Sequence, residues 1–287
     1  MIKTEDQWLQ VLTTGHKPLL ISRRIWRHVP SPPRCKVCGN PFGGVGGRLA
    51  GLMGYRRSRH NPNVCSFCCD TLPRGGAEVD IGVLFADVRG STKISERTSA
   101  SDYAELLNRF YAVATDVLLH HDGLIDKLIG DEAMALFIPG VAGPDYRRKT
   151  VEAAVAVLRG VGYGTPEGPW LEVGVGVNAG QAYVGNVGAA VVDFTALGEP
   201  INVAARLQAA AAGGEIVIAA DVHEDLGAML PGARPQTLDL RGHEAPVPVL
   251  VAGVHPDVNG GGDGAGLARR SARAAATRAL RRRRPTS

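Results

Sequence analysis

Continuous apolar runs alternate with helix-spaced apolar positions through the middle of the chain. The run "VDIGVLFADV" at 79–88 is rich in β-branched and apolar residues and predicts a buried strand. The segment 101–121 has apolar residues at helical spacing and predicts a helix with Ser101 as its N-cap. The same signals predict a strand–turn–strand unit at 123–139, a helix at 145–161, a strand pair at 171–187 and a helix at 199–212. Strands interleaved with helices, some joined as hairpins, indicate an α/β sandwich with a mixed sheet.

Composition divides the chain into three regions. Residues 1–78 hold all five cysteines, 79–254 carry the alternating elements, and 255–287 are a Gly-rich linker followed by an Arg-rich tail. Eight arginines follow Asp263, so removing them from the net charge of +4 leaves the first 263 residues at −4. A mildly acidic body argues against an obligate nucleic-acid partner. The tail is predicted to be disordered, with an amphipathic helix that makes peripheral contact with anionic lipid or nucleic acid as the alternative.

The termini and the hydropathy give no membrane signal. No apolar stretch approaches the roughly 18 to 20 residues that a transmembrane helix needs. The N-terminus "MIKTEDQWLQ" is charged from its start and lacks the apolar centre of a signal peptide. We therefore expect no transmembrane segment and a cytoplasmic location.

Two aspartates stand where predicted strands end. Asp87 closes the strand 79–88 in "FADVRGST", ahead of a helix, and Asp131 lies in the turn of the hairpin "KLIGDEAMALF". Carboxylates from neighbouring strand ends can bridge two Mg²⁺ ions, an arrangement suited to in-line displacement at phosphorus. Asp before a helix is more often a cap, and acids are common in turns, so the pair alone leaves both interpretations open.

Four segments together resemble a known family. "FADVRGST", "KLIGDEAMALF", "GVGVNAGQAYVGNVG" and "DFTALGEPINVAARL" occur in the order and at similar spacing to the motifs of class III nucleotide cyclases. These are the catalytic domains of adenylate and guanylate cyclases, and the resemblance runs from Ile81 to Val254. It implies a ferredoxin-like βαββαβ core with a mixed, largely antiparallel sheet.

The resemblance also implies roles for individual residues. Asp87 and Asp131 match the aspartates that hold two Mg²⁺ or Mn²⁺ ions, with the backbone carbonyl of Val88 as a further ligand. Asn202 matches the asparagine that orients the ribose. Arg206, four residues later on the same helix face, matches the arginine that stabilises charge on the α-phosphate.

Two further positions are implied to read the purine. Lys127 matches the lysine that donates to the adenine ring, where guanylate cyclases usually place an acid. Thr195, in "DFTALG", stands where many adenylate cyclases have aspartate, and it places the chain with a Thr-substituted subclass. A hydroxyl can both accept and donate a hydrogen bond, so threonine discriminates between purines less strictly than aspartate does. The phosphates are expected to meet the backbone amides of residues 89–92 (Arg89, Gly90, Ser91 and Thr92), with Arg241 or His243 as further contacts.

In that family the metal aspartates and the purine and transition-state residues that act together come from different subunits. The resemblance thus implies a homodimeric adenylate cyclase that makes cyclic AMP from ATP for intracellular signal transduction. A guanylate or relaxed purine cyclase is the alternative enzyme. A catalytically silent sensor or scaffold dimer is the alternative of another class.

The cysteines form two CxxC knuckles. Cys35 and Cys38 precede Cys65 and Cys68 by a gap of 26 residues, and Cys69 is a fifth thiol that can replace Cys68. Two knuckles in a reducing compartment indicate a four-thiolate metal site, with zinc the main candidate. An iron–sulfur cluster and redox-active or uncoordinated thiols remain as alternatives. Similar modules precede cyclase domains in some bacterial proteins, which favours a sensory or dimerising role.

Overall fold

The computed structural model describes residues 4–26, 28–29, 33–58, 64–71, 75–188, 193–222, 229–230, 232–240 and 245–254. The Arg-rich tail and the expected phosphate contacts Arg241 and His243 lie outside these residues. The helices are α1 (Glu5–Thr14), α2 (Lys17–Trp26), α3 (Gly44–Leu52), α4 (Ser66–Thr71), α5 (Ser91–Arg97), α6 (Ala100–His120), α7 (Pro139–Ala142), α8 (Tyr146–Gly160), α9 (Glu199–Ala210) and the 3₁₀ turn η1 (Ala220–Val222). The strands are β1 (Gly75–Val88), β2 (Leu124–Ile129), β3 (Glu132–Phe137), β4 (Val173–Val187), β5 (Asp193–Leu197), β6 (Glu215–Ala219), β7 (Arg234–Leu238) and β8 (Val247–Gly253).

All of these strands belong to one mixed sheet. Its order is β2-β3-β1-β4-β6-β8-β7, and β5 pairs with β4 off this path. The β4–β6 pair is parallel, and the other described pairs are antiparallel. The unit β1–α6–β2–β3–α8–β4 has the βαββαβ order and the strand arrangement 2-3-1-4 of a ferredoxin-like core. The predicted fold class is therefore confirmed.

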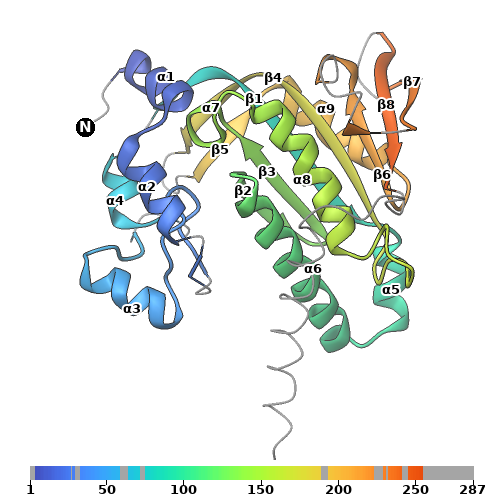
Figure 1. Cartoon of the computed structure of the whole chain (residues 1–287), viewed down its shortest axis with the longest axis horizontal. Helices are drawn as coiled ribbons and strands as arrows, with labels where there is room; N and C mark the ends of the chain where they lie inside the picture. Colours follow the sequence, from blue (N-terminus) through green and yellow to red (C-terminus); the bar gives the residue numbers. More distant parts are fainter. Residues whose placement is uncertain are drawn as a thin grey trace, which may run out of the picture.

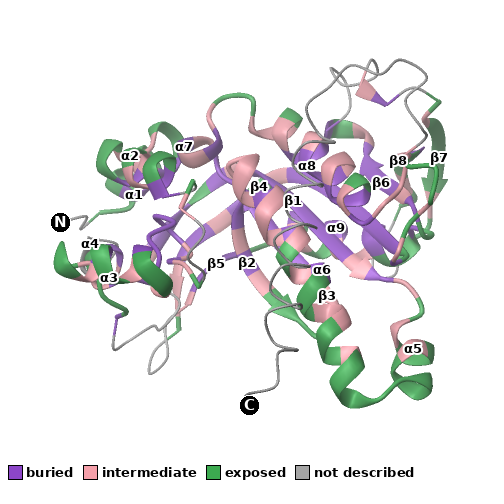
Figure 2. Cartoon of the chain, turned by 60° about the horizontal axis from the view of Figure 1, so that its bottom comes forward, coloured by how far each residue is buried: buried purple, intermediate pink, exposed green. Residues whose placement is uncertain are grey.

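The two faces of the sheet are covered differently. Along β1, Leu84 and Ala86 belong to the core that includes Phe110 of α6 and Leu158 of α8. The alternate residues of β1, among them Val83, belong to a second core formed with the N-terminal helices and the cysteine knuckles. Helices α6 and α8 thus lie on one face, and α1–α4 gather at one end of the sheet, opposite β6–β8 (Figure 1). Both cores share β1, so the N-terminal segment packs directly on the sheet, whose strands are mostly buried in Figure 2.

Two local predictions were wrong. Helix α6 begins at Ala100, and its N-cap is Ser99, whose Oγ accepts a hydrogen bond from the amide of Asp102 at 3.1 Å; Ser101 lies inside the first turn. Within the segment 171–187, where we expected a strand pair, residues Val173–Val187 form one long strand, β4. The reason is its partner: β1 is almost as long and pairs with β4 from Gly75 to Val88, so no turn is needed.

Among the described helices, none combines the length and the hydrophobicity that a membrane-spanning helix requires.

Candidate active site and cysteine cluster

The end of β1 meets the β2–β3 turn and brings the two predicted metal aspartates together. The amide of Val88 donates to the carbonyl of Asp131 at 3.2 Å, and Asp87 lies opposite Glu132 in the antiparallel β1–β3 register. The turn itself is held against α6, because the hydroxyl of Tyr111 donates to the carbonyl of Gly130 at 2.6 Å.

Three acids crowd this edge of the sheet. Burial raises the pKa of Asp87, and the charge of Asp131 raises it further, although the contact with Arg89 opposes both effects. The pKa of Glu132 is raised by its burial and then by Asp87 and Asp131. Such a cluster of half-buried oxygen ligands fits a hard divalent cation. Glu132 was not predicted, although its place beside Asp131 at the start of β3 was a usable signal.

Arg89 links this edge to α9. Its guanidinium contacts the carboxylate of Asp87, and its Nη1 lies 3.5 Å from the carbonyl oxygen of Gln208 and 3.4 Å from that of Ala211. The backbone amide of Arg89 donates to the carbonyl of Glu172 at 2.8 Å. Of the four amides expected to receive phosphate, that of Arg89 is thus already engaged. Gly90, at φ 69°, caps α5, which starts at Ser91 and includes Thr92.

The two predicted purine contacts meet within one chain. The Nζ of Lys127 donates to the hydroxyl oxygen of Thr195 at 3.3 Å, and Thr195 in turn donates its hydroxyl proton to Oδ2 of Asp126 at 2.9 Å. Lys127 also forms an ion pair with Asp126 at 3.5 Å; none with Asp131 occurs among the described residues. Thr195 has one hydroxyl proton, which it donates to Asp126. Its hydroxyl oxygen can therefore only accept hydrogen bonds from other groups.

A β-bulge explains how two neighbouring residues reach Thr195. The β2–β3 register shifts between Ile125 and Lys127, so Asp126 is the extra residue of the strand. Regular alternation would send Asp126 and Lys127 to opposite faces, whereas a bulge re-aims side chains. The Asp126 side chain is fully buried. Sequence reasoning missed Asp126 because a bulge leaves no mark in the hydropathy pattern.

Helix α9 carries the predicted ribose and transition-state residues. Asn202 is exposed and Arg206 half-buried, one helical turn apart. The helix packs closely on β4: a Cβ at Gly176 would overlap the backbone nitrogen of Gln208 and the carbonyl oxygen of Ala204. The position of α9 is therefore set by backbone contact with the sheet.

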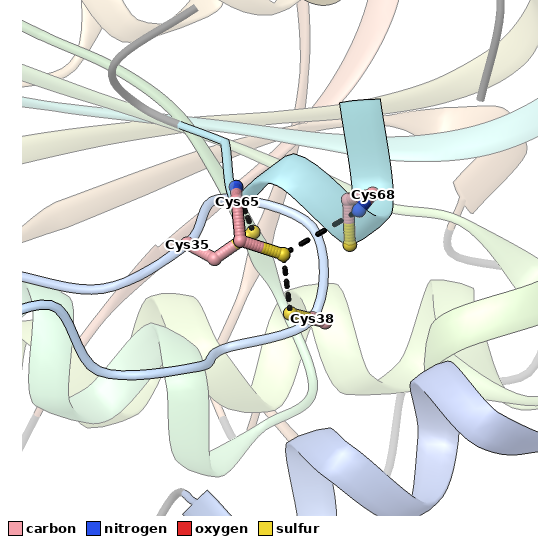
Figure 3. Close-up of side chains that lie close together, drawn as sticks. All are labelled: Cys35, Cys38, Cys65 and Cys68. Atoms are coloured by element: carbon pink, nitrogen blue, oxygen red, sulfur yellow. Dashed lines mark hydrogen bonds between the residues drawn. The ribbon is translucent and has the colours of Figure 1, made fainter. Parts of the chain in front are cut away.

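The four predicted cysteine ligands form one compact group. Cys35, Cys38, Cys65 and Cys68 are buried, and their sulfur atoms lie within 4.8 Å of one another (Figure 3). The sulfurs of Cys38 and Cys65 are 3.6 Å apart. Zinc bound tetrahedrally at about 2.3 Å from each sulfur would separate the sulfurs by about 3.8 Å, so the cluster has a suitable size. Cys69 is partly exposed and lies outside this group.

The electrostatics of the cluster favour a thiolate at Cys35, whereas hydrogen bonding to Cys35 raises the pKa of Cys38 and of Cys68. Burial acts to raise the pKa of Cys35, but hydrogen bonds from the other three thiols outweigh it and bring the pKa well below the ordinary value. The amide of Cys65 also donates to the sulfur of Cys35 at 3.2 Å. The buried guanidinium of Arg23 donates to the carbonyl oxygens of Val37 (3.0 Å) and Gly123 (2.8 Å), which ties the first knuckle to the start of β2.

Comparisons with known proteins agree with this architecture. Residues 77–245, more than half of the chain, match the family described as "Adenylate and Guanylate cyclase catalytic domain", and the chain belongs to this family of class III nucleotide cyclases. Among solved structures, it is similar to the adenylyl cyclase CyaB from P. aeruginosa (TM-score 0.55, 28% identity) and to the guanylyl cyclase Cya2 (TM-score 0.53, 30% identity). In each case the similarity covers 64% of this chain and 98% of the other.

Two relatives in Mycobacterium tuberculosis are uncharacterized proteins. Rv1320c is 35% identical over 179 residues, which cover 60% of this chain and 31% of the relative. Rv1319c is 35% identical over 191 residues, which cover 62% of this chain and 34% of the relative. The chain thus matches about a third of the length of these relatives.

Proposed function

We propose that this protein is an adenylate cyclase that converts ATP to 3′,5′-cyclic AMP and pyrophosphate. The observation that carries the choice of adenine is the commitment of the Thr195 proton to Asp126. The Thr195 oxygen is then left as an acceptor, which suits the exocyclic amino group of adenine. Lys127 adds a cationic donor beside it, which suits the acceptor nitrogens of the adenine ring.

The chain's own groups have distinct tasks in this reaction. Asp87 and Asp131 supply the carboxylates for two Mg²⁺ or Mn²⁺ ions, with the Val88 carbonyl as a further ligand. Bound metal would neutralise phosphate charge and acidify the ribose 3′-hydroxyl. Asn202 orients the ribose, and Arg206 donates to the α-phosphate oxygens as charge develops there. A donor aimed at such charge is worth about 2.7–4 kcal/mol. Amides of residues 90–92 receive the outer phosphates.

The proposed active unit is a homodimer with two composite sites. Apolar side chains beside the site residues remain exposed in the single chain: Leu128 is 40%, Ile129 60% and Leu197 50% exposed. These residues flank Lys127, Asp131 and Thr195 in sequence. A second copy that brought its aspartates to Lys127 and Thr195 (the purine pair) would cover these apolar side chains. Two-fold symmetry would then generate both sites at once.

The N-terminal segment is proposed to be a regulatory module that binds one metal ion through Cys35, Cys38, Cys65 and Cys68. Zinc fits best, because the four sulfurs are compact and buried. An iron–sulfur cluster would use the same ligands and is distinguished by its colour and iron content.

The deciding experiment is incubation of the purified full chain with ATP or GTP, with Mg²⁺ or Mn²⁺, and quantification of the cyclic nucleotides. Cyclic AMP formed in large excess over cyclic GMP supports the proposal. Equal product from both nucleotides would make the protein a relaxed purine cyclase, and excess cyclic GMP a guanylate cyclase. No product from either nucleotide would leave the scaffold interpretation.

A further inference from the structure

A lysine inside the first cysteine knuckle reaches the purine pair. Lys36 lies between Cys35 and Cys38 in sequence, and its Nζ is 2.6 Å from Oδ1 of Asp126. The same Nζ donates to Oδ1 of Asp193 at 3.2 Å. The Lys36 side chain is 6% exposed and that of Asp126 is fully buried. This ion pair is therefore shielded from water, unlike a surface pair, which contributes little.

Asp126 divides its two oxygens between the module and the purine pair. Oδ2 accepts from the hydroxyl of Thr195 and lies 3.5 Å from Nζ of Lys127. Oδ1 accepts no directional hydrogen bond in the described part of the chain, so its compensation there is the ammonium of Lys36. A buried carboxylate needs such compensation.

Removal of the Lys36 charge would change the position of Lys127. Asp126 would lose one of the two cations that lie beside it in the described part of the chain, and the other is Lys127. Lys127 would be drawn toward Asp126 and away from the base that it is proposed to bind. The effect would appear in nucleotide affinity more than in the chemical step, because the phosphates are served by other residues.

The knuckle is itself well anchored to both strands that carry the purine pair. Lys36 bridges β2, through Asp126, and β5, through Asp193 at its first residue. Arg23 adds an independent link from Val37, in the same knuckle, to Gly123 at the start of β2. The same knuckle carries Cys35 and Cys38, two of the four grouped sulfurs.

We propose that Lys36 is a positioning residue for purine recognition, through which metal bound by the four cysteines sets the affinity of the same chain for its nucleotide. Metal would fix the Cys35–Cys38 loop, the loop would fix Lys36, and Lys36 would hold Asp126, Thr195 and Lys127 in their binding arrangement. The inference rests on the proposed function, and it makes the purine-binding residues of the same chain the target of the cysteine module.

The first test compares Lys36→Met with Lys17→Met, an exposed lysine on α2, in the metal-loaded full chain. Lys36→Met should raise KM for ATP about tenfold, with kcat changed much less and the metal content unchanged. Lys36→Arg should restore much of the affinity, because it keeps the charge. A Lys36→Met enzyme with the same KM as Lys17→Met would overturn the proposal. A fall of about tenfold in kcat with KM unchanged would overturn it as well.

The second test does not depend on turnover. Hydrogen exchange is measured on the wild-type chain before and after the cysteine-bound metal is extracted. Extraction should accelerate exchange in β2 and β5, whereas β6 and β8, at the other end of the sheet, should change little. In Lys36→Met, β2 and β5 should already exchange faster before extraction. Unchanged exchange in β2 and β5, or a wild-type chain that binds no metal, would overturn the proposal.

The two tests separate this inference from the proposed function. A chain that forms no cyclic nucleotide but shows the exchange response would refute the enzyme assignment and keep the coupling. A chain that forms cyclic AMP with KM and exchange insensitive to Lys36 would keep the enzyme and refute the coupling.

Discussion

The hydroxyl of Thr195 stands between a cation and an anion, accepting from Lys127 at 3.3 Å and donating to Asp126 at 2.9 Å. Thr195→Val keeps the branched shape and removes both bonds. It should raise KM for ATP about fivefold to tenfold, because the buried Asp126 loses a donor and Lys127 an acceptor. Steady-state kinetics with both nucleotides checks this.

The matched control is Thr237→Val, an exposed strand position on β7. It should leave KM and kcat unchanged. If Thr195→Val behaves like this control, the hydroxyl has no part in binding the base.

Glu132 provides a test of the acidic edge. Its pKa is raised by burial and then by Asp87 and Asp131, which indicates that the three carboxylates repel one another. Glu132→Gln removes one charge, and the Mg²⁺ concentration for half-maximal activity should rise severalfold. In the metal-free protein the same change should not lower the urea midpoint, since repulsion is relieved. Glu105→Gln, exposed on α6, is the control and should change neither quantity. A lower urea midpoint for Glu132→Gln alone would contradict the repulsion that we infer.

The sequence predicted most of the fold because its signals are local. The apolar run of β1, the helical spacing of α6 and the Gly130 turn each specify an element within a short window, and the order of the elements yields the ferredoxin-like core. The N-cap of α6 was misplaced by two residues because Ser99 and Ser101 carry the same capping chemistry. Only the observed hydrogen bond separates them.

The supporting residues of the site could not be predicted, for a different reason. Lys36 and Asp126 are far apart in sequence and meet only because the N-terminal segment packs on the sheet. The bulge at Asp126 depends on the register of β3. Motif spacing identifies groups that touch a ligand, whereas groups that hold those residues in place depend on tertiary packing.

The choice between Cys68 and Cys69 gives a direct prediction on the metal. Cys68 belongs to the four-sulfur group, and Cys69 is partly exposed outside it. Cys69→Ser should retain one metal ion per chain, whereas Cys68→Ser should lose most of it, because a buried four-thiolate site loses a ligand. Elemental analysis of the purified proteins measures both. Metal loss in Cys69→Ser with retention in Cys68→Ser would assign the ligand to the other thiol.

The backbone contact between Gly176 and α9 can be tested by adding one methyl group. Gly176→Ala would force α9, with Asn202 and Arg206, away from β4. We expect a loss of about 1–3 kcal/mol in the free energy of unfolding. We also expect kcat to fall about a hundredfold, because a small misplacement of positioning groups is costly. Gly51→Ala on α3, where a Cβ meets nothing within 4 Å, should leave kcat unchanged and should not lower the free energy of unfolding, because alanine favours a helix more than glycine does. A Gly176→Ala enzyme with normal kcat would show that α9 need not be held so closely.

The shared-site arrangement makes the sharpest prediction. Asp87→Ala removes a proposed metal ligand and Arg206→Ala a proposed transition-state donor, so each homodimer should be inactive. If the two residues of one site come from different subunits, a mixed dimer contains one doubly damaged site and one intact site. Equal mixing with free exchange should then restore about a quarter of wild-type activity, since half of the dimers are mixed and each has one of two sites working. The measurement is cyclic AMP formation together with mass analysis of tagged subunits. Mixed dimers that form and stay inactive would place both residues of a site in the same chain.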